Sequence, residues 1–496
     1  MRLALIFPPF RYKLHEENLA KVQRFFGLFP PLSMAWVAAI AERAGHETLL
    51  IDARTLELDI AETARRVNAF RPDLIGYMMT TYMFGETREW IRGIRARVDV
   101  PVIVGGFNLR VYPKESIAHP EIDFGVVEQA LETLPLFLTE FAGARRYETV
   151  PGLVWKEGGE IRMTESRPVR FDDFPHPLRR DLPNDLYAEF PTEQKNFTVM
   201  VTSLGCPCGC TFCEVSHTPY NARSPEKVLA EMEECRREYR VREIDLFDYN
   251  FTFDRRRTTT ICEEMLRRDL RLQWACRSRV DAVDRPLLKL MSESGCRRIY
   301  YGIESDSPDK LSEMHKGITL TQVEDAIRAT REAGIKTLGF FLTGVAGETA
   351  ETIKRTVHYA TRLNLDYAQF SKLTAKPGSP MWQDMLARTG DDYWRKYILG
   401  QVEERELERP WTALTNDEIN RLTKLAYLRF YVRPGFLWRS LLGIRTWTEF
   451  KRKTRALFSM IFAQSKRAVL DTRFKAYQEN PHRRLRKYVK PAPADN

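Results

Sequence analysis

Short apolar runs alternate with helical patterns of apolar residues over the first 140 residues of the chain. The apolar positions recur with helical spacing near residues 33–44, 60–70 and 86–97. Continuous apolar runs, typical of buried strands, are found at residues 2–7, 47–51, 73–77, 101–106 and 123–127. Such strands, alternating with helices, are typical of a parallel sheet covered on both faces. The pattern predicts an α/β fold that begins with a doubly wound, Rossmann-like domain at residues 1–140.

The same alternation resumes at residue 196. Strands are expected at residues 198–203, 243–248, 272–277, 297–303, 336–342 and 366–371, with helices between them. Thr319 and Gln322 have the spacing of a capping box, and Ser224 before Pro225 has the pattern of a helix N-cap. A complete eight-fold barrel typically needs about 250 residues. We therefore predict a partial (β/α)6 barrel at residues 196–394.

Two regions interrupt this pattern. Residues 141–195 begin with a predicted hairpin, whose turn is Gly158-Gly159, and continue as a proline-rich, charged linker. From residue 395 to residue 496 the pattern is helical and basic. Ligands of parallel α/β sheets bind where the strands end. In the N-terminal domain, Pro8, Thr80, Gly105 and Gly106 fall at such positions.

The composition is that of a soluble globular protein, with 43% hydrophobic and 29% charged residues. The N-terminus lacks signal-peptide features and no apolar stretch is long enough to span a bilayer, so we expect a cytoplasmic protein. The net charge of +10 gathers near the C-terminus, which is weak evidence for nucleic acid, and we expect none as a partner. Residues 430–447 mix large apolar side chains with Arg. This suits an interfacial helix in peripheral membrane contact, or equally a helix packed on the barrel with a solvated basic face.

Four of the eight cysteines fall between Cys206 and Cys213, directly after the strand expected at residues 198–203. The C-x3-C-x2-C spacing of Cys206, Cys210 and Cys213 can hold three corners of a 4Fe–4S cluster and leave one iron open to a small molecule. Cys208 lies inside the x3 loop and cannot easily reach the same cluster. A structural zinc site usually has four ligands in two separated pairs, which fits this string poorly.

The cysteine string, with the aromatic Phe212 before its last cysteine, resembles the radical S-adenosylmethionine (SAM) superfamily. The segments FDYNFTFD (247–254), WACRSRVD (274–281), GIES (302–305) and GVAGET (344–349) are similar to that family's later strand ends, although Ala346 stands where proline is commoner. The resemblance implies an open iron that binds SAM, which is cleaved reductively to a 5′-deoxyadenosyl radical. It also implies SAM contacts at Phe212, Asp248, Asn250, Arg279 and Glu304. Glu304 could instead be a salt-bridged surface acid, and Asp248 and Asn250 ordinary loop residues.

An α/β domain before such a barrel resembles the cobalamin-binding subclass, on residues 30–53 and 103–108. This implies cobalamin at the sheet edge that holds Pro8, Thr80, Gly105 and Gly106. The motif D-x-H-x-x-G, which supplies an axial histidine, is absent, so we expect cobalamin bound base-off without a histidine ligand. The subclass commonly transfers a methyl group from cobalamin to an unactivated carbon.

Several alternatives stay open. Some relatives in the subclass are cyclases or rearrangement enzymes without methyl transfer, and a degenerate domain could be a non-catalytic cobalamin-binding module. A tRNA methylthiotransferase carries further N-terminal cysteines, whereas this chain has none before Cys206. The resemblance implies a small-molecule substrate such as a lipid, a tetrapyrrole or a natural-product scaffold. It also implies an external electron donor such as flavodoxin or ferredoxin.

Overall fold

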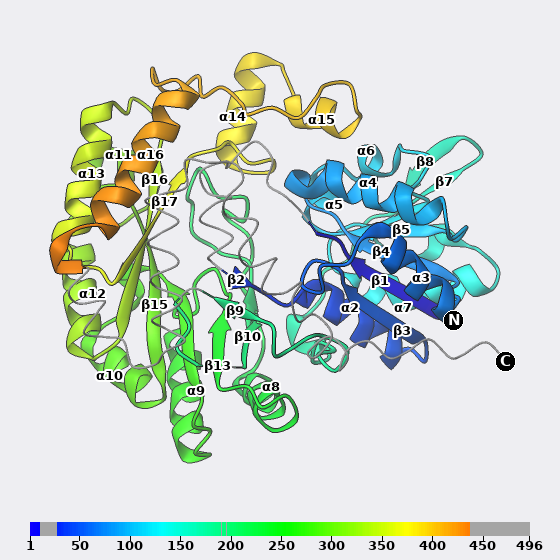
Figure 1. Cartoon of the computed structure of the whole chain (residues 1–496), viewed down its shortest axis with the longest axis horizontal. Helices are drawn as coiled ribbons and strands as arrows, with labels where there is room; N and C mark the ends of the chain where they lie inside the picture. The colour runs from blue at the N-terminus through cyan, green and yellow to red at the C-terminus, as the bar shows by residue number, and fades with distance from the viewer. Residues whose placement is uncertain (10–26, 190, 195, 437–496) are drawn as a thin grey trace, which may run out of the picture.

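A computed structural model describes residues 1–9, 27–189, 191–194 and 196–436, arranged as two α/β units side by side (Figure 1). The first unit is built on a seven-stranded sheet in the order β3-β1-β4-β5-β6-β7-β8. Its parallel strands are β1 (Arg2–Phe7), β3 (Glu47–Asp52), β4 (Leu74–Met78), β5 (Val102–Gly105) and β6 (Phe124–Val126). This order confirms the doubly wound prediction.

Helices cover both faces of this sheet because its strands are apolar on both sides. One face packs against α2 (Leu32–Arg43) and α7 (Ala130–Ala142), through residues such as Leu5 and Ile103. The other face packs against a second set of helices: α3 (Ile60–Phe70), α4 (Phe84–Arg95), α5 (Phe107–Val111) and α6 (Pro113–Ile117).

The predicted hairpin belongs to the first sheet rather than to a linker. Strands β7 (Leu153–Glu157) and β8 (Glu160–Met163) add to its edge, and β7 pairs with β6 in antiparallel register, with Trp155 opposite Phe124. The first sheet therefore continues past residue 140, because the hairpin hydrogen bonds to β6, a strand formed earlier in the chain.

The second unit is a curled, six-stranded parallel sheet, open between its first and last strands. The strands are β10 (Phe197–Met200), β13 (Glu243–Leu246), β14 (Gln273–Ser278), β15 (Cys296–Glu304), β16 (Lys336–Thr343) and β17 (Tyr367–Lys372). Its outer helices include α8 (Pro225–Glu238), α9 (Arg255–Arg267), α10 (Arg285–Glu293), α12 (Leu320–Glu332), α13 (Ala350–Arg362) and α16 (Asn416–Tyr431). The predicted partial barrel is confirmed.

Helix starts follow the sequence signals with one change. Thr319 and Gln322 form the expected capping box of α12. Ser224 is the N-cap residue of α8 by position, but its hydroxyl donates to the Asp172 carboxylate (2.9 Å) instead of capping the helix. The hydroxyl thereby ties the linker to the barrel.

The linker closes the amino end of the barrel strands. Its strand β9 (Ala188–Glu189) pairs with β2 (Gly27–Leu28). Beyond β9, the Glu243 carboxylate at the start of β13 accepts the backbone N–H groups of Glu193 (2.8 Å) and Gln194 (2.9 Å). Because β13 begins at Glu243, these bonds place the linker beneath the barrel strands, at the end opposite the cysteines.

The chain returns to the first unit after the barrel. Helices α14 (Pro380–Thr389) and α15 (Tyr393–Ile398) bury Trp382 and Trp394 against the α3/α4 side of the first sheet. No helix in the described ranges is long and apolar enough to cross a bilayer. Most of residues 430–447, the predicted interfacial segment, lie outside the described residues.

Candidate functional site

The cysteine loop is held in place by hydrogen bonds that its backbone N–H groups donate within the loop. The Cys206 N–H donates to the Thr218 hydroxyl (2.9 Å), the His217 N–H to the Cys208 carbonyl (3.0 Å), and the Cys213 N–H to the Cys210 carbonyl (3.1 Å). A side chain at Gly205 would collide with the Pro219 carbonyl, at 2.0 Å, and its φ is +75°. Glycine is therefore required where the chain turns from the barrel into the loop.

The cysteine thiols differ in environment. A hydrogen bond from Cys208 lowers the pKa of Cys206 to about 7, and the same bond raises the pKa of Cys208. Burial raises the pKa of Cys210 and of Cys213, while Lys316 and Arg279 oppose this rise at Cys210. Cys208 thus acts as a neighbour and hydrogen-bond donor to Cys206.

The donor set suits a cluster better than a single ion. Within the described residues, no group of three or more His, Cys, Asp or Glu side chains is placed to hold one metal ion. A cubane binds each thiolate at a separate iron, so its ligands do not converge on a point. Three soft sulfur donors on one prearranged loop, beside the cationic Lys316 and Arg279, therefore fit a 4Fe–4S cluster.

Glu304 forms a buried ion pair that the sequence did not reveal. Its carboxylate accepts from the Lys316 ammonium at 2.8 Å, and both side chains are only 8% exposed. Burial alone would lower the pKa of Lys316, but Glu304 and Cys210 raise it. A side chain at Gly302 would meet both charged groups, at 2.6 and 2.7 Å, so the glycine of GIES leaves room for the pair.

The backbone at Glu304 is strained. Its φ is +68°, and the register between β15 and β16 shifts there. A non-glycine residue in this region costs energy and persists where the surroundings impose it, often at functional sites. The pair also lies beside the cysteine loop, because Lys316 is 5.9 Å from the centre of the Phe212 ring.

The loop after β13 contains both other polar candidates, with different roles. The Asp248 carboxylate is saturated by the Thr202 N–H (2.6 Å), the Thr202 hydroxyl (2.5 Å) and the Ser203 hydroxyl (2.7 Å). Asp248 therefore fixes the segment that leads into the cysteine loop, and its oxygens are already engaged. The carbonyl oxygen of the buried Asn250 side chain accepts the Arg279 N–H (3.3 Å).

The Asn250 amide nitrogen, by contrast, is buried and has no acceptor among the described residues. A buried polar atom without a partner is costly unless a ligand supplies one. Arg279 is anchored to the Asp281 carboxylate and the Lys316 carbonyl, both at 2.8 Å. The carboxyl end of the barrel thus offers one free amide donor and a fixed ion pair near the cysteines, which suits a polar, zwitterionic ligand such as SAM.

A cavity of about 620 Å³ joins the two units. Its first wall is the α2/α7 face of the N-terminal sheet, with Leu5, Trp36 and Ile103. Its second wall belongs to the barrel unit and includes Thr218 and Tyr249. The hairpin exit completes it with residues 166–169.

Two of the predicted cobalamin residues line this cavity and two do not. Gly105 and Gly106 line it, whereas Pro8 and Thr80 do not. Gly106 has a φ of +120°, and a side chain there would meet the Met79 carbonyl at 2.7 Å. The Trp36 indole N–H has no acceptor within the described chain, and none of the described lining residues is a histidine. An apolar cavity with a free donor and no imidazole fits cobalamin bound without a histidine ligand.

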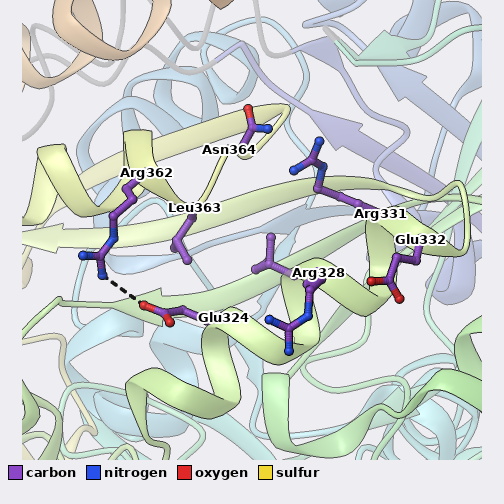
Figure 2. A pocket seen from close by; sticks show the side chains of 8 residues that line it. Glu324, Arg328, Arg331, Glu332, Arg362, Leu363 and Asn364 are labelled. Atoms are coloured by element: carbon purple, nitrogen blue, oxygen red, sulfur yellow. Dashed lines mark hydrogen bonds and ion pairs between the residues drawn. The ribbon is translucent and has the colours of Figure 1, made fainter.

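A second hollow, of about 750 Å³, lies on the outer helices (Figure 2). It is lined by the ends of α12 and α13, where Arg362 pairs with Glu324 at 3.0 Å. These helix ends precede β16 and β17 directly, so the hollow is at the amino end of the barrel, away from the cysteines. Size alone therefore does not mark the functional site.

Comparison with known proteins supports the same two units. The model of the radical SAM superfamily matches residues 200–360, and that of the B12 binding domain matches residues 21–138. The chain is 30% identical over 448 residues to the uncharacterized methyltransferase PH0819 of Pyrococcus horikoshii, covering 88% of this chain and 94% of that protein. It is 26% identical over 424 residues to the anaerobic magnesium-protoporphyrin IX monomethyl ester cyclase of Rubrivivax gelatinosus, covering 83% and 75%.

Solved structures share the fold. The radical SAM methyltransferase TsrM from Kitasatospora setae, with cobalamin and a [4Fe-4S] cluster bound, superposes with a TM-score of 0.65 at 22% identity, covering 78% of each chain. The cobalamin-dependent radical enzyme OxsB, with aqua-cobalamin and SAM bound, gives a TM-score of 0.68 at 15% identity, covering 98% of this chain and 75% of that one. This chain belongs to the cobalamin-binding subclass of the radical SAM superfamily. It is therefore an enzyme that uses a 4Fe–4S cluster, SAM and cobalamin.

Two residues of this site escaped prediction from the sequence. Lys316 follows α11 (Pro308–Glu313), and no local motif links it to Glu304. Tyr249 stands between Asp248 and Asn250, and its only signal was its place in the segment after β13. Both become evident only when the strand ends are brought together.

Proposed function

We propose that this protein is a cobalamin-dependent methyltransferase that acts on an unactivated carbon of a small molecule. The observation that carries the proposal is the cavity of about 620 Å³, which is lined by Gly105 and Gly106 of one unit and by Thr218 of the cysteine loop in the other. Thr218 is hydrogen bonded to Cys206 itself, at 2.9 Å. A cofactor in this cavity would therefore lie next to the cluster loop.

We assign the cluster to Cys206, Cys210 and Cys213, and SAM binding to Asn250, Glu304 and Lys316, with Phe212 and Arg279 supporting them. When bound, the cluster and SAM supply a carbon-centred radical, and cobalamin supplies a methyl group. The chain's own residues arrange these groups. Asp248 fixes the entry to the cysteine loop, and the Glu304–Lys316 pair presents a charged surface at the barrel mouth.

We infer that cobalamin is bound base-off. No histidine is found among the described cavity residues and the D-x-H-x-x-G motif is missing, so no imidazole of the chain is expected to replace the cofactor's own base. Reconstitution with hydroxocobalamin, desalting and electron paramagnetic resonance of the cob(II)alamin form tests it. Retention of about one cobalamin per chain without nitrogen superhyperfine splitting is expected. Failure of the folded, cluster-loaded protein to retain cobalamin would overturn the methyltransferase proposal.

Methyl transfer itself is tested with methyl-deuterated SAM. The reduced, fully reconstituted protein is incubated anaerobically with extracts of the host lacking the gene, and products are analysed by mass spectrometry. A product with a new methyl group that carries three deuterium atoms and is joined by a carbon–carbon bond is expected. Formation of 5′-deoxyadenosine with an unlabelled, dehydrogenated or cyclised product would instead favour a cyclase.

The cyclase is the second candidate because three relatives carry that name, including the Rubrivivax protein at 26% identity. Other relatives are named as methyltransferases that act on a cytidylyl phosphonate and on a bacteriochlorophyllide, and a further relative is named as a hopanoid methylase. A tetrapyrrole, lipid or natural-product scaffold is therefore the substrate class to screen first.

We also propose two partners. An external donor such as flavodoxin or ferredoxin would reduce the cluster. Four of the eight cysteines are in the cysteine loop, and the other four are single buried residues scattered over the barrel, so they do not form a second cluster motif that could pass electrons to the first. The basic segment at residues 430–447 is the candidate for peripheral membrane contact. Sedimentation with anionic liposomes is expected at low salt, and its absence at both low and high salt would exclude that contact.

A further inference from the structure

The loop between β13 and α9 holds Tyr249 on a rigid backbone. On one side of it, Asp248 is bonded to Thr202 and Ser203. On the other side, the Phe251 N–H donates to the Arg277 carbonyl at 2.9 Å. The backbone at Tyr249 is therefore fixed at both sides.

The Tyr249 side chain is unusually exposed for this setting. It is 49% exposed, whereas the flanking Asp248 and Asn250 are 1% and 5% exposed. The ring lines the cavity between the two units. No aromatic ring of the described residues packs against it, in contrast to Phe253 of the same loop, whose ring is 4.9 Å from that of Tyr220.

The surroundings of the Tyr249 phenol place it between the two cofactor sites. Although half of the side chain surface is exposed, the surrounding protein desolvates the phenol and, together with Glu214, Cys213 and Cys206, raises its pKa to about 12, whereas Arg110 lowers it. Cys206 and Cys213 belong to the cluster loop, whereas Arg110 lines the cavity from the N-terminal unit. The ring thus stands at the boundary between cluster and cavity.

An aromatic ring on a fixed loop, without a packing partner and facing a cavity, is a contact surface for a ligand. We propose that Tyr249 is a positioning residue for cobalamin, contacting the macrocycle where the cavity meets the cluster loop. This inference rests on the proposed function. A flat, largely apolar macrocycle with amide substituents matches a phenol ring, which offers an apolar face and a single hydroxyl.

Cobalamin binding to the cluster-loaded full chain tests the proposal. Hydroxocobalamin is titrated anaerobically into wild type, Tyr249→Ala, Tyr249→Phe and Phe253→Ala, and the dissociation constant is measured after confirming equal iron content. Phe253→Ala is the matched control, since Phe253 is in the same loop, is 44% exposed and does not line the cavity. The spectrum of the cob(II)alamin form is recorded for each variant by electron paramagnetic resonance.

We expect Tyr249→Ala to raise the dissociation constant for cobalamin about tenfold and to alter the cob(II)alamin signal, with the cluster retained. Tyr249→Phe keeps the ring and should remain within about twofold of wild type, as should Phe253→Ala. Unchanged binding and an unchanged signal in Tyr249→Ala would overturn the inference, and so would an equal loss in Phe253→Ala. Wild-type protein that retains no cobalamin would refute the proposed function itself, so the two failures are distinguishable.

Discussion

The two ends of the barrel sheet are built from the same strands, yet their buried polar groups have different surroundings. At the amino end, Arg298 donates to the Pro191 carbonyl (2.8 Å) and to Glu243 (3.2 Å), and the Glu189 carboxylate meets the Tyr300 hydroxyl (2.9 Å). At the carboxyl end, the Asn250 amide nitrogen has no partner among the described residues. The amino end thus carries a buried network of charged groups that pair within the protein, whereas the carboxyl end holds a buried amide donor and an ion pair beside the cysteine loop.

The sharpest test of the carboxyl end is the removal of a thiolate that is expected to bind the cluster. Alanine at Cys206, Cys210 or Cys213 should abolish the cluster, because a three-thiolate site cannot lose one ligand. Iron content and the absorbance near 400 nm after anaerobic reconstitution measure the effect. Cys208→Ala is the matched control and should keep most of the cluster. If Cys208→Ala loses as much iron as the others, the ligand assignment is wrong.

At the amino end of the barrel, a substitution should instead change the stability of the fold. Glu243 is 2% exposed and accepts from Arg298 and two linker N–H groups. Glu243→Ala removes the acceptor of both linker N–H groups and one of the acceptors of the Arg298 guanidinium, and should lower the free energy of unfolding by about 3–5 kcal/mol. Urea unfolding of the apo-protein measures the loss.

Arg328→Ala is the control for this experiment. Its ion pair with Asp325 is exposed, so it should cost no more than about 1 kcal/mol. A similar cost for both variants would remove the distinction between a buried network at the amino end and an ordinary surface pair.

Features of each end that depend on neighbouring residues in the sequence could be predicted, whereas features that depend on distant residues could not. The strand expected at residues 336–342 is found at Lys336–Thr343, because a buried parallel strand is marked by its own apolar run. The cysteine loop was equally local. The linker bonds to Glu243 join residues 50 positions apart, and no pattern within either segment announces them.

Asp248 shows the same limit at the functional end. Its position after a strand suggested a ligand contact, but its carboxylate is taken by Thr202 and Ser203, which are 46 and 45 residues away. Strand identity could be predicted because each strand carries its own signal. Side-chain partners depend on which strand ends meet, and that is settled only by the folded topology.

The stability that the amino end contributes should also depend on pH. Burial, aided by Asp245, raises the pKa of Glu189 from 4.5 to about 8. Between these values the folded state keeps the proton and the unfolded state releases it, so this group makes stability fall as pH rises. Relative to Glu189→Gln, wild type should lose up to about 1.4 kcal/mol per pH unit within that window. If the free energies of unfolding of the two proteins change with pH in the same way from pH 5 to pH 8, this prediction is wrong.

The smallest expected effect concerns the Glu304–Lys316 pair. This pair is buried and satisfied, as the charged groups of the amino end are, yet it lies at the carboxyl end, where ligands are expected to bind. If it serves SAM, Glu304→Ala should weaken SAM binding about tenfold, or about 1.4 kcal/mol, while the cluster is retained. Lys316→Ala should do likewise, because the carboxylate would lose its anchor.

A double-mutant cycle separates ligand binding from simple pairing. Isothermal titration of SAM into the cluster-loaded single and double variants gives their coupling energy, and urea unfolding of the same proteins gives the coupling in stability. If the pair is only structural, coupling appears in unfolding and SAM affinity is unchanged. If the pair orients SAM, the two single variants each lose affinity and the double variant loses less than their sum, because either substitution alone already disorders the same surface. The φ of +68° at Glu304 agrees with the second result, since backbone strain of this kind often accompanies a functional site.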